Sequence, residues 1–148
     1  AVAGEPDEEM ANETNLRWGD SITLEGYTLR PSTLAACDIA QVTLFWRSEE
    51  PLAERYKVFI HLVDEQGQLV AQRDGEPGGG LVLTTTWRPG ETVVDNHGLL
   101  VPMGTAAGQY TVLLGLYPLG SPDTRLTVEA ATGAADAYPI GTITIGEG

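Results

Sequence analysis

Short stretches in which apolar and polar residues alternate recur along most of the chain. In residues 39–47, Val42, Leu44 and Trp46 alternate with side chains that belong to the opposite face, and residues 56–63 repeat the pattern. Alternation with a period of two predicts β-strands, whereas a helix needs a period of 3.6. Because the helical period is sustained nowhere, we expect an all-β protein without parallel βαβ units.

Glycine, proline and acidic turn residues divide the chain into a regular series of predicted strands. We expect a first strand pair at 21–24 and 27–29, interrupted at Gly26, and further strands at 39–47, 56–63, 68–73, 92–101, 109–117, 125–129 and 140–145. The strands at 56–63 and 68–73 are expected to form a hairpin, joined by a tight turn at 64–67 in which Gly67 supplies a positive φ. Residues 81–86 are expected to be a short extended segment, and 74–80 a flexible loop. About eight or nine strands with frequent turns predict two antiparallel sheets packed face to face, an immunoglobulin-like β-sandwich.

One local motif supports this class of fold. Tyr110 follows Gly108 by two residues, at the beginning of a predicted core strand. Immunoglobulin-like sandwiches place a tyrosine corner at such a position, with the phenol bonded to nearby backbone. We therefore expect the Tyr110 hydroxyl to bond upstream backbone.

The length of 148 residues suits one domain with its own core. Residues 1–15 are acidic and poor in apolar side chains, so we expect a flexible lead-in or linker there and a single sandwich domain over 16–148. Cys37 is the one cysteine, which excludes a disulfide within the chain. We interpret it as a small buried residue, and the alternative interpretation is a reactive thiol.

Charge narrows the range of partners. With 21 acidic and eight basic residues the formal net charge is −13. Such a field repels nucleic acids and anionic lipid surfaces, so neither is an expected partner. No apolar run is long enough to span a bilayer, so we expect no direct membrane insertion of this segment.

The residues that could support catalysis or metal binding are few. His61 and His97 are the two histidines, and neither belongs to a G-x-S-x-G or comparable nucleophile motif. Neither zinc-ligand spacing nor a DxDxDG calcium loop is present. Five loop acids could form a looser calcium site, but we interpret them as solvated turn residues: Asp64, Glu65, Asp74, Glu76 and Asp95. We expect no enzyme activity, no metal and no cofactor.

Four segments together resemble a known type of bacterial domain. They are FWR (45–47), YKVFIHLVDEQGQLVAQRDGEPGGG (56–80), TTTWRPGETVVD (84–95) and AGQYTVLLGLYP (107–118), and the run WGDSITLEGYTL (18–29) is similar to its opening strands. That domain is an extracytoplasmic β-sandwich at the C-terminal ends of large multi-pass, glycosyltransferase-like membrane proteins of green non-sulfur (Chloroflexi) bacteria. The resemblance covers about four-fifths of the chain. It implies a location in the cell envelope, tethered to a membrane protein, and no assigned activity or functional residues.

Two hypotheses of function follow. The first is a non-catalytic accessory or interaction domain whose partner is its own parent membrane protein. Phe59 and Val63 are apolar on the face of their strand that His61 shares, which indicates that this second face is covered, either by the domain's own loops or by a partner. The second is a carbohydrate-binding module for an envelope polysaccharide, with Trp87 as the exposed ring that stacks on a sugar and with Arg88 and Asp95 beside it. For Trp87 the alternative interpretation is packing at one end of the core. Trp46, which alternates with Val42 and Leu44, is expected in the core.

Overall fold

The computed structural model describes residues 11–31, 33–121, 123–130 and 133–146. These residues form two β-sheets and two short 3-10 turns, η1 (Pro77–Gly80) and η2 (Thr84–Thr86). The strands are β1 (Asn12–Trp18), β2 (Ile22–Arg30), β3 (Thr33–Leu34), β4 (Ile39–Ser48), β5 (Tyr56–Val63), β6 (Leu69–Gly75), β7 (Val93–Leu100), β8 (Gly108–Pro118), β9 (Val128–Ala130), β10 (Gly133–Ala135) and β11 (Tyr138–Ile145).

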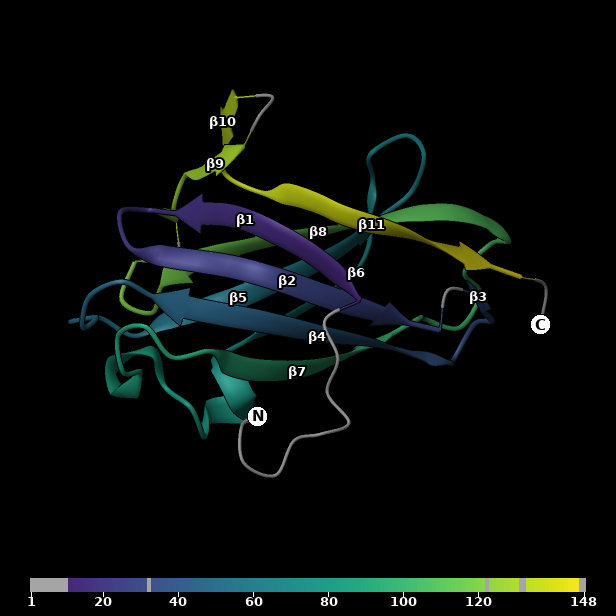
Figure 1. Cartoon of the computed structure of the whole chain (residues 1–148). Coiled ribbons are helices and arrows are strands. Elements are labelled where there is room, and N and C mark those ends of the chain that lie inside the picture. Colours follow the sequence, from purple (N-terminus) through teal and green to yellow (C-terminus); the bar gives the residue numbers. More distant parts are fainter. Residues whose placement is uncertain (1–10, 32, 122, 131–132, 147–148) are drawn as a thin grey trace.

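The strands form a sandwich of two layers (Figure 1). One sheet has six strands in the order β10-β9-β1-β2-β4-β7, and the other has five in the order β3-β11-β8-β5-β6. All neighbouring strands are antiparallel except β3 and β11, which pair in parallel. The predicted all-β, two-sheet antiparallel sandwich is confirmed. The strands beyond the eight or nine expected include the two- and three-residue pieces β3, β9 and β10, which are too short to give a periodic signal.

The core lies between the sheets and is built from the alternating positions that the sequence indicates. Trp46 is fully buried beside Trp18, with ring centroids 5.5 Å apart and the rings edge to face. Val58, Ile60 and Leu62 of β5 face them from the other sheet and are fully buried. The interpretation of Trp46 as a core residue is therefore confirmed.

The strand pair expected at 21–24 and 27–29 is one continuous strand, β2, with a bulge at the predicted break. Its register against β4 shifts between Leu24 and Gly26. The Thr14 hydroxyl donates to the Leu24 carbonyl at 2.7 Å, so a side chain bonds backbone where the register is irregular. The glycine signal thus marked a kink within a strand rather than the end of one.

The first strand begins earlier along the chain than the sequence suggests. β1 starts at Asn12 and pairs with β2 as far as Trp18, and the Ala11 amide donates to the Thr28 hydroxyl at 3.0 Å. Residues 12–15 therefore belong to the sheet and not to a flexible lead-in, because backbone pairing offsets their lack of apolar side chains. Residues 1–10 lie outside the described residues.

Several local predictions are confirmed. The Tyr110 hydroxyl donates to the Ala106 carbonyl at 2.6 Å, which is the expected tyrosine corner. β5 and β6 form the expected hairpin, and Gly67 at its turn has a φ of 79°, a conformation that favours glycine. The Asp64 carboxylate accepts the Gln66 and Gln68 amides and so closes this turn.

Candidate functional site

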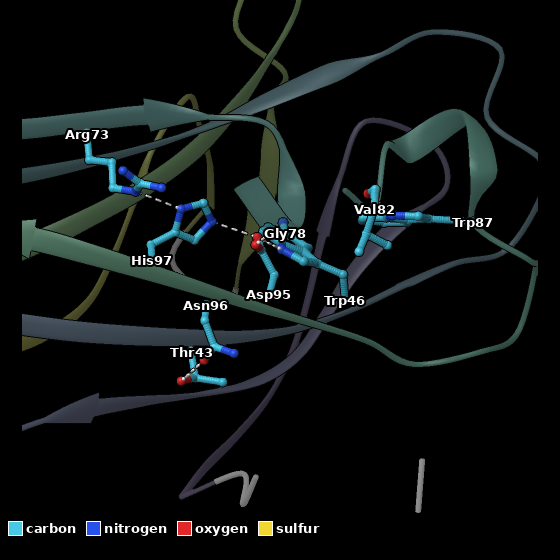
Figure 2. Close-up of polar contacts among 9 residues, drawn as sticks. All are labelled: Thr43, Trp46, Arg73, Gly78, Val82, Trp87, Asp95, Asn96 and His97. Carbon is cyan, nitrogen blue, oxygen red and sulfur yellow. Dashed lines mark hydrogen bonds and ion pairs between the residues drawn. The ribbon is translucent and has the colours of Figure 1, made fainter. Parts of the chain in front are cut away.

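A buried carboxylate stands at the edge of the sandwich where β6 and β7 meet. Asp95 of β7 is fully buried and its two oxygens accept three hydrogen bonds (Figure 2). The Trp46 indole donates to Oδ2 at 3.1 Å, the Gly78 amide donates to Oδ1 at 2.7 Å, and His97 Nε2 lies 2.7 Å from Oδ2. A carboxyl group buried this deeply is tolerated only when its oxygens are hydrogen-bonded in this way.

His97 continues the network toward the second sheet. Arg73 Nε of β6 donates to His97 Nδ1 at 3.1 Å, so this nitrogen acts as the acceptor. The proton of a neutral imidazole then resides on Nε2 and is donated to Asp95. Arg73 of one sheet is thus joined through His97 to Asp95 of the other. Because the side chains of His97 and Asp95 are both 0% exposed, we interpret this network as a latch that holds the two sheets together along this edge.

The glycine-rich segment after β6 is held by this network. It was expected to be a flexible loop, but Pro77–Gly80 forms the turn η1, and its Gly78 amide is bonded to Asp95. Gly78 has a φ of 66°, and a Cβ there would lie 2.6 Å from Val82 Cγ2, so glycine is required on both grounds. Arg55 adds a two-pronged salt bridge to Glu76 just before the turn.

Trp87 is part of the core and not an exposed ring. It is 5% exposed, its ring centroid lies 6.4 Å from that of Trp46, and its indole donates to the Val82 carbonyl at 2.9 Å. The expectation that this ring is open for stacking on a sugar is therefore wrong, and packing at the end of the core is confirmed. The chain before it bends into η2 rather than extending, and this turn carries Val82 back onto the indole.

The three residues predicted to bind a ligand together do not share a surface. Trp87 and Asp95 are buried on either side of Trp46, whereas Arg88 is exposed. The nearness of Trp87 and Asp95 was anticipated from the sequence, but their direction was not. Both side chains point into the sandwich, where the indole and the carboxylate have protein partners.

His61 lies on the outer face of the five-stranded sheet, in a cluster with Phe59 and Tyr117. The Phe59 ring is 1% exposed, 4.9 Å from the His61 ring, and covered by the Arg125 guanidinium at 4.3 Å. Burial lowers the pKa of His61, the charge of Arg125 lowers it further, and Asp74 opposes them. The apolar outer face of β5 is thus covered by the chain's own β8–β9 connection, one of the two coverings that the sequence allowed.

Tyr117 completes this cluster. Its ring stacks against Phe59 with centroids 6.2 Å apart, and its hydroxyl donates to Asp74 at 2.7 Å. Burial together with this bond raises the pKa of Tyr117 to about 12. Asp74, like Asp64 and Glu76, therefore has a structural partner, and the part of the chain that the structure describes contains no group of three or more potential metal ligands.

The outer face of the six-stranded sheet has a different character, with two hollows at opposite ends of β2 and β4. One hollow of about 370 Å³ is lined by Asn15, Arg17, Thr23, Arg47, Glu49 and Glu129. The other, of about 360 Å³, is lined by Arg30, Ile39, Gln41, Asn96, His97 and Gly98. This second hollow, termed here the Arg30 groove, escaped sequence reasoning, which did not show which face of the sheet stays uncovered.

Gly98 lines the Arg30 groove. Across the sheet, Arg30 of β2 pairs with Gln41 of β4, and Gln41 pairs with Gly98 of β7, so the three residues form one row. A Cβ at Gly98 would lie 3.2 Å from Ile39 Cγ2, so the missing side chain lets Ile39 pack closely against β7 and leaves the backbone of Gly98 as part of the groove lining. A glycine within a predicted strand is the signal that could have located this groove.

Comparisons with known proteins reveal the fold but not a family. No protein-family model matches the chain, and no protein of curated function matches it in sequence. Among solved structures it is similar to the C-terminal domain of wzt, with 13% identity and a TM-score of 0.60 over 97% of this chain and 80% of that one. A Niemann-Pick type C2 protein from the Japanese carpenter ant has 6% identity and a TM-score of 0.47 over 95% of this chain and 98% of that one.

Proposed function

We propose that the chain is a non-catalytic accessory domain of a larger bacterial envelope protein and that it works through the outer face of its six-stranded sheet. The observation that best supports the non-catalytic part of this proposal is the burial of the Asp95–His97 pair. Catalysis by this pair requires a substrate to reach the imidazole, yet both side chains are 0% exposed and His97 Nδ1 is occupied by Arg73. The pair therefore serves the fold.

The setting within a larger protein is supported from two directions. Segments of the chain resemble extracytoplasmic domains at the ends of multi-pass membrane proteins, and the fold is similar to that of a domain that is itself C-terminal in wzt. In the part of the chain that the structure describes, no helix is long and apolar enough to cross a membrane. The resemblance, and not this finding, is what leads the proposal to place the membrane anchor in the parent protein.

The exposed thiol of Cys37 offers a direct test of location. Cys37 was interpreted as a buried residue, but it lies exposed in the turn between β3 and β4 with a φ of 75°. A membrane-impermeant maleimide should label the parent protein in intact cells, and the Cys37→Ser variant should lose that label. Labelling of Cys37 only after lysis would contradict an extracytoplasmic location.

The interaction surface can be tested by photo-crosslinking from the two outer faces. Gln41 lies on the outer face of the six-stranded sheet, and Gln72 lies beside His61 on that of the five-stranded sheet. Both are exposed, so a photoreactive residue at either position should leave the fold intact. We expect crosslinks to a partner in cells from position 41 and not from 72. Crosslinks from position 72 alone would place the interaction on the five-stranded sheet and would contradict the proposal.

Carbohydrate binding is the second candidate function. Burial of Trp87 removes the ring on which that hypothesis first depended. The observation that now favours it is the Arg30 groove, in which guanidinium and amide groups line a sugar-sized hollow on an exposed sheet face.

A further inference from the structure

We propose that the Arg30 groove binds the carboxylate of an acidic saccharide, such as a uronic acid residue of an envelope polysaccharide. This inference rests on the proposed function and specifies its ligand. It begins with the chemistry of the six residues that line the groove. None of them is aspartate or glutamate, although the chain has 21 acidic residues and a net charge of −13.

The hydrogen bonds at the groove engage the amide oxygens of Gln41 and Asn96, so that their amide nitrogens can donate to a ligand. Arg30 Nη2 donates to Gln41 Oε1 at 3.4 Å, so the Gln41 oxygen faces the guanidinium and its amide nitrogen is available to a ligand. Asn96 Oδ1 accepts from the Thr43 hydroxyl at 2.6 Å, which leaves its nitrogen in the same role. Three side chains thus offer N–H groups, and a guanidinium matches the two oxygens of a carboxylate.

The shape of the groove suits one ring-sized group. Its volume of about 360 Å³ lies near the lower end of the range for small-molecule sites. Gly98 supplies a floor without a side chain, and Ile39, which is 56% exposed, supplies an apolar wall for the C–H face of a sugar. A donor set for the carboxylate and an apolar wall for the ring are the two requirements of a uronic acid.

A saccharide fits this location better than a peptide. The backbone of β4 is paired on both sides, with β2 and with β7, so a ligand lying across these strands contacts side chains. Peptides that bind a sheet usually add a strand to an open edge, where backbone groups provide affinity. Recognition mainly through side-chain amides and a guanidinium favours a ligand rich in oxygen acceptors.

The test is a titration of the purified chain with trigalacturonic acid, monitored by the backbone amide signals of Asn96 and Gly98 and by calorimetry. Ionic strength near 0.15 M screens distant acids beyond about 8 Å. We expect saturable binding that the carboxyl-reduced trisaccharide lacks. Arg30→Gln should weaken the affinity for trigalacturonic acid about tenfold or more, because hydrogen bonds between charged groups are stronger than those between neutral groups. Gly98→Val should abolish it by filling the groove.

Arg17→Gln is the matched control, since it removes an arginine from the other hollow of the same face and should leave affinity unchanged. The inference is overturned if trigalacturonic acid does not bind, if the reduced sugar binds equally, or if Arg17→Gln weakens binding as much as Arg30→Gln does. Tighter binding of an acetylated tri-glutamate peptide at the same amides would also overturn it. In each case crosslinking from position 41 would still test the accessory function separately.

Discussion

The outer faces of the two sheets differ in what fills them. On the five-stranded sheet, Phe59 lies over Gly115, with the Arg125 guanidinium above its ring. On the six-stranded sheet, Gly98 meets the side chain of Ile39, whose Cγ2 lies 3.2 Å from the place of a Cβ, and it lines the hollow beside Arg30. A strand glycine is thus covered by an aromatic ring on one face, whereas on the other its backbone lines a hollow. An arginine completes the covering in the first case and is presented to solvent in the second.

The largest expected effect lies at the edge between the faces. Asp95→Ala removes the acceptor of the Trp46, Gly78 and His97 donors, so buried N–H groups lose their partner. We expect a loss of about 3 to 5 kcal/mol in the free energy of unfolding, as for other buried polar networks. Urea denaturation measures it. Asp123→Ala, at an exposed position, is the control and should stay within about 0.5 kcal/mol. A loss below 1 kcal/mol for Asp95→Ala would contradict the latch.

The second effect concerns the closed face. A Cβ at Gly115 would lie 2.1 Å from Phe59 Cζ, so Gly115→Ala forces the ring to move. Overpacking of this kind costs about 1 to 3 kcal/mol of stability. Phe59→Leu shortens the side chain and should recover part of that loss in the double variant, which gives a coupling energy in a double-mutant cycle. Additive single losses would mean that the two positions do not touch.

These contacts explain how far the sequence predicts the molecule. Alternation gave the strands, because the inner face of each, such as Val58, Ile60 and Leu62, is determined by burial in one core. It also indicated that the Phe59 face is covered, but not by what, since Arg125 is 66 residues away along the chain. Trp87 had two interpretations from the sequence, an exposed stacking ring or a side chain packed at one end of the core, because it lies at a junction between a loop and a strand. The bend at η2 that buries its indole depends on tertiary contacts with Val82 and Trp46, which no local pattern encodes.

A smaller effect follows from removing the cover on Phe59. Arg125→Ala removes a cation held 4.3 Å above the ring and should cost about 0.5 to 1 kcal/mol. It should also raise the pKa of His61, because both the positive charge and part of the burial that lower it are lost. An NMR titration of the His61 ring protons measures this shift, and Arg88→Ala is the control. An unchanged pKa would show that Arg125 does not cover the cluster in solution.

The same pKa sets a pH dependence with a definite sign. The pKa of folded His61 is lower than its ordinary value of 6.5, so the unfolded chain takes up the proton first as the pH falls. The stability that His61 contributes is complete above about pH 6.5 and declines below it. Arg125→Ala should reduce this decline, since it brings the folded and unfolded pKa values closer. A steeper loss of stability below pH 6.5 in this variant would contradict the conclusion that Arg125 lowers the pKa of His61.

The smallest effect on stability is expected on the open face, and it separates function from fold. Arg30 is exposed, and its hydrogen bond to Gln41 is long at 3.4 Å. Arg30→Gln should therefore change the free energy of unfolding by no more than about 0.5 kcal/mol, as do most surface substitutions. Urea denaturation of this variant beside Arg125→Ala compares one arginine from each face. If Arg30→Gln cost more than Arg125→Ala, the six-stranded face would be the one on which the fold depends. A negligible change in the free energy of unfolding, together with a tenfold loss of affinity for the saccharide, would instead show that Arg30 serves ligand binding and not the fold.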